Sequence, residues 1–190
     1  YPFNINHPVN IEDSILKEVE KLRLKNISPN FNPYSGSTKC GLKQIISKLL
    51  RPGYINNRYS EYIISEYSRN PQNMFYRIFL SRFIDGNLKS HLFDNRKQKR
   101  SAKYYTILLF IICYNLSVLQ YYIKGFRHND LHLANVFIKI NSKKLIDEKK
   151  VNKYTIFGET YYIPQLDITP IISDFDFSAS DKYKNSKVSD

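Results

Sequence analysis

The chain contains the stretch His128-Asn129-Asp130-Leu131-His132-Leu133-Ala134-Asn135, which is followed directly by the apolar run Val136-Phe137-Ile138. An acid and an amide five positions apart stand in front of a segment whose apolar residues favour a strand. A second apolar run, Ile171-Ile172-Ser173, ends on another acid, Asp174. This order of loop, strand, strand and acid predicts one site built from two segments that are distant in the sequence.

The residue types of the first stretch suit phosphoryl transfer. The Asp130 carboxylate can accept the proton of an attacking hydroxyl group, and the Asn135 amide oxygen can bind a magnesium ion. Each residue also has a simpler alternative. Asp130 can serve as a capping or turn residue, and Asn135 can be a buried amide that bonds its own loop.

Length and composition agree with an ordinary globular domain. The 190 residues allow a real core, and the 42% hydrophobic and 24% charged residues are typical of soluble proteins. Two cysteines are too few for a disulfide framework and favour a reducing compartment. We therefore expect an intracellular location. The chain begins at Tyr1 without a leader pattern, so we expect it to be an excerpt.

The formal net charge of +12 raises the question of an anionic partner. Lysines and arginines are spread along the chain, and such residues usually form a solvated face. Attraction for acidic substrates, nucleic acid or an anionic membrane surface stays open. The apolar run 107–113 is far shorter than a membrane span needs, so we expect a core helix and no span.

Hydrophobic spacing predicts most of the regular elements. Apolar residues at helical spacing predict a helix over 11–25, and residues 32–41 read as a loop by composition. Residues 42–50 fit a short helical or extended piece. The runs 62–67 and 76–81 predict an antiparallel hairpin, with a turn-rich join between them.

The second half of the chain begins with two helices. A short helix is expected over 88–93, and the longest helical pattern covers 102–123 and ends before Gly125. We expect a strand over 136–140 and an exposed loop over 141–153. The runs 154–157 and 160–163 flank Gly158-Glu159 and predict a second hairpin. A last strand covers 171–173, and the tail after residue 178 has no pattern.

Motif and element order together resemble the core of a protein kinase. Within kinases, the His-Asn-Asp-Leu-His sequence and the long insert before Asp174 look most like haspin and the protein kinases of large DNA viruses. The resemblance implies an α+β, two-lobed kinase fold that is incomplete at both ends. For a viral protein, the expected intracellular location would be the host cytoplasm or the virion interior. Residues 1–81 would be the small-lobe portion from the C-helix, 82–87 the hinge, and 88–190 the large-lobe portion to just past the metal-binding acid.

The resemblance also assigns roles at the loop. Asp130 would be the catalytic base, and Asn135 and Asp174 would bind Mg²⁺ together with ATP. His132 stands where most protein kinases carry a Lys that contacts the transferred phosphate, and it either replaces that Lys or packs the loop. His128 is expected to bond the backbone near Asp174 and to pack against Phe175.

Two departures from the family pattern concern regulation and flexibility. Asn129 stands where many kinases have the Arg that reads a phosphorylated activation loop, so we expect no control of that type. Asp176 replaces the Gly of Asp-Phe-Gly, which removes a flexible residue and adds a charge near the metal ligands.

The resemblance assigns nucleotide contacts upstream as well. Glu18 would be the helix carboxylate that pairs with a small-lobe Lys, because it borders the apolar face of its helix. Glu20 has a similar spacing, and either residue can instead be an exposed Glu. Backbone groups of Ser81 and Phe83 would bond adenine, and Phe137 would pack beneath the adenine ring.

Three functions fit these observations. The first is ATP- and Mg²⁺-dependent phosphoryl transfer to Ser or Thr of a protein substrate. The second is a small-molecule kinase, because aminoglycoside and choline kinases share the His at the position of His132. The third is a pseudokinase that acts as a binding scaffold, which Asp176 and the lack of a Gly-rich loop or strand Lys before Glu18 favour.

Overall fold

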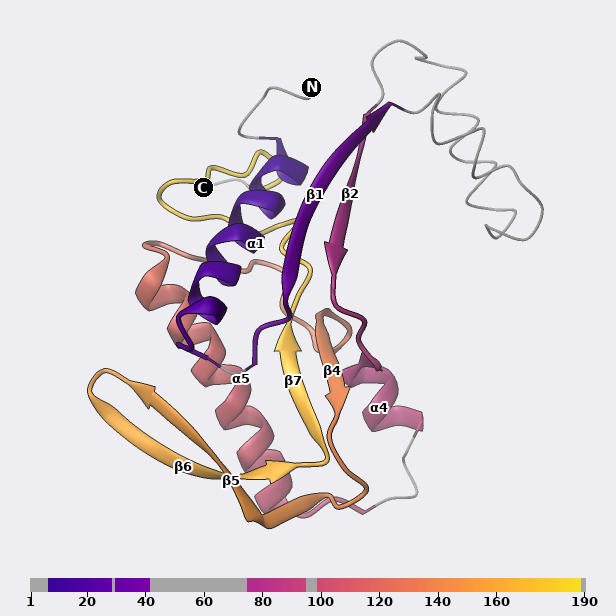
Figure 1. Ribbon diagram of the computed structural model, residues 1–190, viewed down its shortest axis with the longest axis vertical. Coiled ribbons are helices and arrows are strands. Elements are labelled where there is room, and N and C mark those ends of the chain that lie inside the picture. The colour runs from indigo at the N-terminus through magenta and orange to yellow at the C-terminus, as the bar shows by residue number, and fades with distance from the viewer. Residues whose placement is uncertain (1–6, 29, 42–74, 95–98, 189–190) are drawn as a thin grey trace, which may run out of the picture.

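The computed structural model describes residues 7–28, 30–41, 75–94 and 99–188, which form a mixed structure of helices and antiparallel sheets. One end holds α1 (Pro8–Leu24) beside the pair β1 (Tyr34–Gly41) and β2 (Phe75–Ser81), as Figure 1 shows. The other end holds α4 (Leu88–Asp94) and α5 (Ala102–Tyr122). These elements are compatible with the α+β class expected from the sequence.

The central sheet links the two ends. β3 (Gly86–Asn87), β4 (Val136–Ile140) and β7 (Ile168–Ile172) pair in that order, and both pairings are antiparallel. A short 3₁₀ turn, η1 (Leu133–Asn135), leads directly into β4. The strands expected over 136–140 and 171–173 are confirmed, although β7 begins earlier and ends one residue before Ser173.

The helix expected over 11–25 is confirmed as α1, whose apolar spacing forms its buried face. Its fully or nearly buried hydrophobic side chains are Ile11, Ile15, Val19 and Leu22. The segment after α1 is fixed to α5 by side-chain bonds. The Ser28 hydroxyl donates to Asn115 Oδ1 at 2.8 Å, and the Tyr114 hydroxyl donates to the Ile27 carbonyl at 2.9 Å. Residues 27 and 28 are thereby held against α5.

The long helix expected over 102–123 is confirmed as α5, and the short helix expected over 88–93 as α4. The last turn of α5 closes with the Ile123 amide donating to the Leu119 carbonyl, and Gly125 follows with φ of 70°. By length and composition alone α5 could cross a membrane, but a core helix meets the same criteria. Eight of its residues are buried in the core.

Two predicted loops are wrong, because both segments form strands. Residues 32–41 include β1, which pairs with β2, and residues 141–153 include most of β5 (Ile146–Ile156). Both sequences are polar, and their strand conformation comes from pairing with a partner rather than from local preference. The strand expected over 76–81 is confirmed as β2. Its expected partner at 62–67 and the piece at 42–50 lie outside the described residues.

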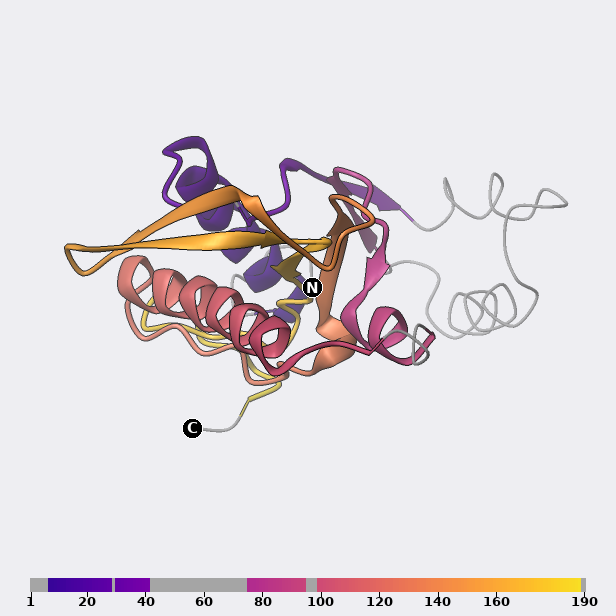
Figure 2. The same cartoon turned by 90° about the horizontal axis from the view of Figure 1, so that it is seen from below.

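The second hairpin is confirmed as β5 paired with β6 (Glu159–Leu166). Its turn lies one residue earlier than expected, at Phe157-Gly158, and both residues have positive φ angles of 53° and 83°. Such a pair of angles is typical of a type I′ turn. Figure 2 shows this ribbon lying along α5, where Tyr154 packs edge-on against Tyr114 with ring centroids 4.8 Å apart.

Candidate active site

The Asp130–Asn135 loop is closed by the amide of Asn135. Its Nδ2 donates to the Asp130 carbonyl at 2.9 Å and to Asp130 Oδ2 at 3.2 Å. Asn135 is buried, whereas Asp130 is only half-buried. Because Nδ2 faces the acid, the amide oxygen of Asn135 is left to accept other partners. One side chain therefore fixes the acid and also presents an oxygen of its own.

His132 begins the short turn that carries Asn135. Its Nδ1 accepts a bond from the Ala134 amide at 3.2 Å, and its Nε2 lies 3.9 Å from Asp130 Oδ2. Since Nδ1 accepts, the ring proton of the neutral imidazole is on Nε2, which faces the acid. The exposed ring thus caps the turn and also lies beside the Asp130 carboxylate. Its catalytic role stays a prediction.

Pairing of β4 with β7 brings Asn135 next to the segment that carries Asp174. Val136 pairs with Ile172, and just beyond this pair both the amide and the hydroxyl of Ser173 donate to the Asn135 carbonyl, at 3.0 and 2.9 Å. Asp174 follows immediately, with an exposed side chain and φ of 61°. The two predicted metal ligands therefore lie at the same end of one strand pair.

His128 has the structural role that the sequence predicts. Its Nε2 donates to the Ser173 carbonyl at 2.9 Å, and its ring lies 5.4 Å from the Phe175 ring, centroid to centroid. Phe175 is almost completely buried and also packs against Phe126. Burial lowers the pKa of His128, so the neutral ring is favoured. This contact holds the loop and the Asp174 segment together.

Asn129 supports the residues after Asp174. It has φ of 62°, a conformation that Asn tolerates better than most residues, and its Nδ2 donates to the Phe177 carbonyl at 3.0 Å. Next to this contact, the Ser178 hydroxyl donates a hydrogen bond to the His128 carbonyl. Arg127 and Ala179 exchange two backbone hydrogen bonds of 2.9 Å. Both sides of the loop are thus bonded to residues 173–179.

The tail after residue 178 folds back on Asp176, which corrects the expectation of no pattern. Asn185 is buried, and its Nδ2 donates to the carbonyls of Asp176 at 2.7 Å and Ser178 at 2.9 Å. Lys187 forms an ion pair with the Asp176 carboxylate. These contacts fix the segment in which Asp176 stands in place of the flexible Gly of the family pattern. Asn185 and Lys187 were missed because no local pattern marks them.

Glu18 lies on the side of α1 that faces the tail. Its carboxylate is 3.1 Å from Lys21, 3.9 Å from Lys182 and 3.4 Å from the Tyr183 hydroxyl. The pairing of Glu18 with a small-lobe Lys stays a prediction.

Another α1 carboxylate shares the surroundings of Asp174. Burial, and then the carboxylates of Asp176 and Asp174, raise the pKa of Glu12 to about 7, while Lys187 opposes the rise. Glu12 directly follows the buried Ile11, and this border position is the signal that the sequence offered.

Replacing Glu12 by Gln should raise the melting temperature at pH 8 more than at pH 5. Because the pKa of Glu12 in the folded protein is above its usual 4.5, the folded state loses stability as pH rises from about 4.5 to about 7. Gln removes this penalty. Thermal unfolding without magnesium at both pH values measures the difference, with the exposed Glu148→Gln as control. An equal shift at the two pH values would contradict the assignment.

The predicted nucleotide contacts lie at the junction of the two ends. Ser81 ends β2 opposite Tyr34, and the following Arg82 amide donates to the Pro33 carbonyl at 3.1 Å. The Phe83 side chain is 88% exposed. Phe137 is half-buried in β4 and pairs with Asn87. Ser81 ends β2 and Phe83 follows it in the connection to β3, whereas Phe137 lies on β4 opposite Asn87 of β3. The adenine contacts of all three residues stay predictions.

Comparison with known proteins gives a kinase-like relationship. No protein-family model matches the chain. The chain is similar to a protein of Acanthamoeba polyphaga mimivirus that is named "Putative serine/threonine-protein kinase". The two are 22% identical over 182 residues, which cover 93% of this chain and 38% of the mimivirus protein. The chain thus spans less than half the length of that relative.

Proposed function

We propose that this chain is part of an enzyme that transfers phosphate from ATP, with Mg²⁺, to Ser or Thr of a protein substrate. The observation that carries the proposal is the gathering of Asp130, Asn135 and the Asp174 segment at one end of the β4–β7 pair. The name of the mimivirus relative supports the kinase class and the Ser/Thr acceptor.

Asp130 would act as the base. Its Oδ2 is held by Asn135, which leaves Oδ1 to accept the proton of the acceptor hydroxyl as that oxygen attacks. The bond from Asn135 also fixes the direction of the carboxylate before the acceptor binds. Such positioning contributes to the rate because the acceptor oxygen and the base must be within hydrogen-bond reach.

The residues at this end of the strand pair fit a magnesium ion. The Asn135 amide oxygen and the Asp174 carboxylate are hard oxygen donors, and among the described residues no ion pair engages Asp174. Within the same residues, no group of three or more His, Cys, Asp and Glu could hold a metal by itself. Mg²⁺ commonly takes one or two protein ligands and completes its shell with water and phosphates. When bound, the ion would neutralise phosphate charge.

ATP binding by the full chain, measured with and without Mg²⁺, tests the proposal. We expect magnesium-dependent binding, and Asp174→Ala should weaken it by about tenfold or more because one charged oxygen ligand is lost. The exposed Asp181→Ala, seven residues further on, is the matched control. ATP binding that does not depend on Mg²⁺, or that is unchanged in the Asp174 variant, would contradict the assignment of Asp174 as a magnesium ligand.

An acceptor screen separates the proposed function from its alternatives. Protein, aminoglycoside and choline acceptors would be offered with Mg²⁺ and ATP under the same conditions. Transfer to protein alone would support the proposal, and transfer to a small molecule alone would overturn it. Nucleotide binding without any transfer would favour the scaffold.

A further inference from the structure

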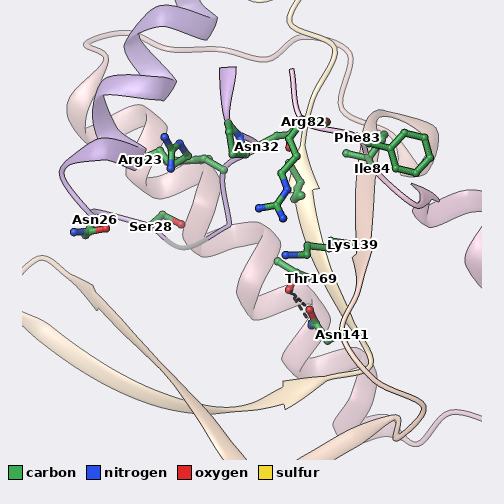
Figure 3. Close-up of a pocket in the computed structure, with 13 residues that line it drawn as sticks. Arg23, Asn26, Ser28, Asn32, Arg82, Phe83, Ile84, Lys139, Asn141 and Thr169 are labelled. Atoms are coloured by element: carbon green, nitrogen blue, oxygen red, sulfur yellow. Dashed lines mark hydrogen bonds between the residues drawn. The ribbon is translucent and has the colours of Figure 1, made fainter. Parts of the chain in front are cut away.

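A polar cavity of about 320 Å³ lies beside residues 82–84, which join the two ends of the molecule. Its walls come from the end of α1 and the residues after it, from residues 82–84, and from β4 and β7. Figure 3 shows the side chains of Arg82 and Lys139 extending into the same space, while Phe83 points away from them. The cavity is separate from the Asp130 loop, none of whose residues lines it.

Three cationic side chains line this cavity: Arg23, Arg82 and Lys139. Arg23 is already paired, because its guanidinium makes two bonds to Glu20, of 2.7 and 2.8 Å. No carboxylate of the described residues lies within ion-pair distance of Arg82 or Lys139. Asp85, the acid nearest to Arg82 in the sequence, accepts a bond from the Ile140 amide instead. Arg82 and Lys139 are both exposed to solvent, so the open side of the cavity carries two positive charges that the described part of the chain leaves unneutralised.

Backbone contacts hold Arg82 in place. Its amide donates to the Pro33 carbonyl at 3.1 Å, and its carbonyl accepts from Asn32 Nδ2 at 3.0 Å. Lys139 is fixed differently, because it sits on β4 opposite Thr169 of β7. Backbone hydrogen bonds therefore fix the main chain at both residues. Only the flexible side chains need to become ordered around a ligand. Such partial preorganisation lowers the cost of binding.

We infer that this cavity binds the phosphate group of a small molecule through Arg82 and Lys139. A phosphate monoester carries close to two negative charges at neutral pH, which match the two unneutralised cations. The guanidinium of Arg82 can bond two phosphate oxygens side by side, and the ammonium of Lys139 supplies a point charge. Asn26 and Asn32, which also line the cavity, add neutral amides at its rim.

Titration of the full chain with inorganic phosphate by calorimetry, without Mg²⁺ or nucleotide, tests this site. Arg82 and Lys139 do not belong to the Asp130 loop, so a loss of binding in their variants locates the phosphate in the cavity whether or not the chain is a kinase. We expect binding, and Lys139→Gln or Arg82→Gln should each weaken it by about tenfold or more. Lys149→Gln, on the exposed β5 ribbon, is the matched control and should bind as the unchanged chain does.

A second arm identifies the source of the phosphate. A short phosphoserine peptide and its unphosphorylated form would be titrated in the same way. Phosphate and phosphopeptide binding of equal strength, both dependent on Lys139, would support a small-molecule phosphate. A phosphopeptide that binds much more tightly than phosphate would overturn the small-molecule assignment in favour of a protein ligand. No phosphate binding, or binding unaffected by both cavity variants, would overturn the site itself.

Discussion

Replacing Asp130 by Asn is expected to lower the rate of phosphoryl transfer by about 10²- to 10⁴-fold, the usual contribution of a positioned general base. The substitution keeps the size of the side chain and leaves an oxygen that can accept the bond from Asn135 Nδ2. The loop should therefore keep its shape, and the affinity for Mg²⁺ and ATP should change little. Steady-state transfer and nucleotide binding, measured on the same preparation, check both halves of this expectation.

The control for Asp130 is Asp147→Asn, which removes a carboxylate on β5, away from the loop. It should leave both the rate and the affinity unchanged. A normal rate in the Asp130 variant would refute the base assignment. Equal losses of rate and of nucleotide affinity would show instead that Asp130 maintains the structure of the nucleotide site through its hydrogen bond with Asn135.

The sequence predicted the loop and its strands because their signals are local. The apolar runs that became β4 and β7 carry their own periodicity, and the residues around Asp130 are recognisable as a motif. His128 could be assigned a structural role for the same reason. The regions that were not predicted depend on contacts with residues that are distant in the sequence. β1 is a polar strand whose conformation comes from β2, and Asn185 meets Asp176 only because the tail folds back.

The helix carboxylates show the limit of periodicity most clearly. Spacing places both Glu12 and Glu18 at the border of the apolar face of α1, so it cannot choose between them. The choice depends on what packs against each side of the helix. Glu18 meets Lys182 and Tyr183 of the tail, whereas Glu12 is close enough to Asp174 and Asp176 for their charges to raise its pKa. Of the two carboxylates, Glu12 is therefore the one whose pKa responds to Asp174, the residue to which the proposed function assigns Mg²⁺.

The largest loss of stability is expected at Asp13, the buried acid that joins α1 to the β1–β2 pair. Its carboxylate accepts bonds from the Tyr34 and Ser37 hydroxyls, both at 2.6 Å, and lies 2.5 Å from Arg77 and 2.7 Å from Lys17. Asp13→Ala would leave the Arg77 guanidinium, whose side chain is 11% exposed, without its acid, so unfolding should need about 3–5 kcal/mol less free energy. Urea unfolding at pH 7 measures the loss.

The pH dependence of Asp13 gives an independent check on the same contacts. Burial alone would raise its pKa, but hydrogen bonds from Lys17, Ser37 and Tyr34, together with the charge of Arg77, outweigh burial and lower the pKa to about 2. Because this value lies below the usual 3.8, the stabilising contribution is present above about pH 4 and is lost as pH falls towards 2. The stability difference between the unchanged chain and Asp13→Asn should shrink over that interval.

Lys21→Gln on the same helix provides the comparison for Asp13. It breaks the exposed ion pair with Glu18, and such pairs contribute about 0–1 kcal/mol. A large effect at Asp13 beside a small one at Lys21 would mean that burial and the shared hydroxyl donors, rather than charge pairing alone, attach α1 to β1 and β2. Similar effects at the two positions would mean that the Asp13 contacts do not hold the helix in place. Glu12 and Asp13 lie on the same helix, so the position of Glu12 relative to Asp174 would then need another explanation.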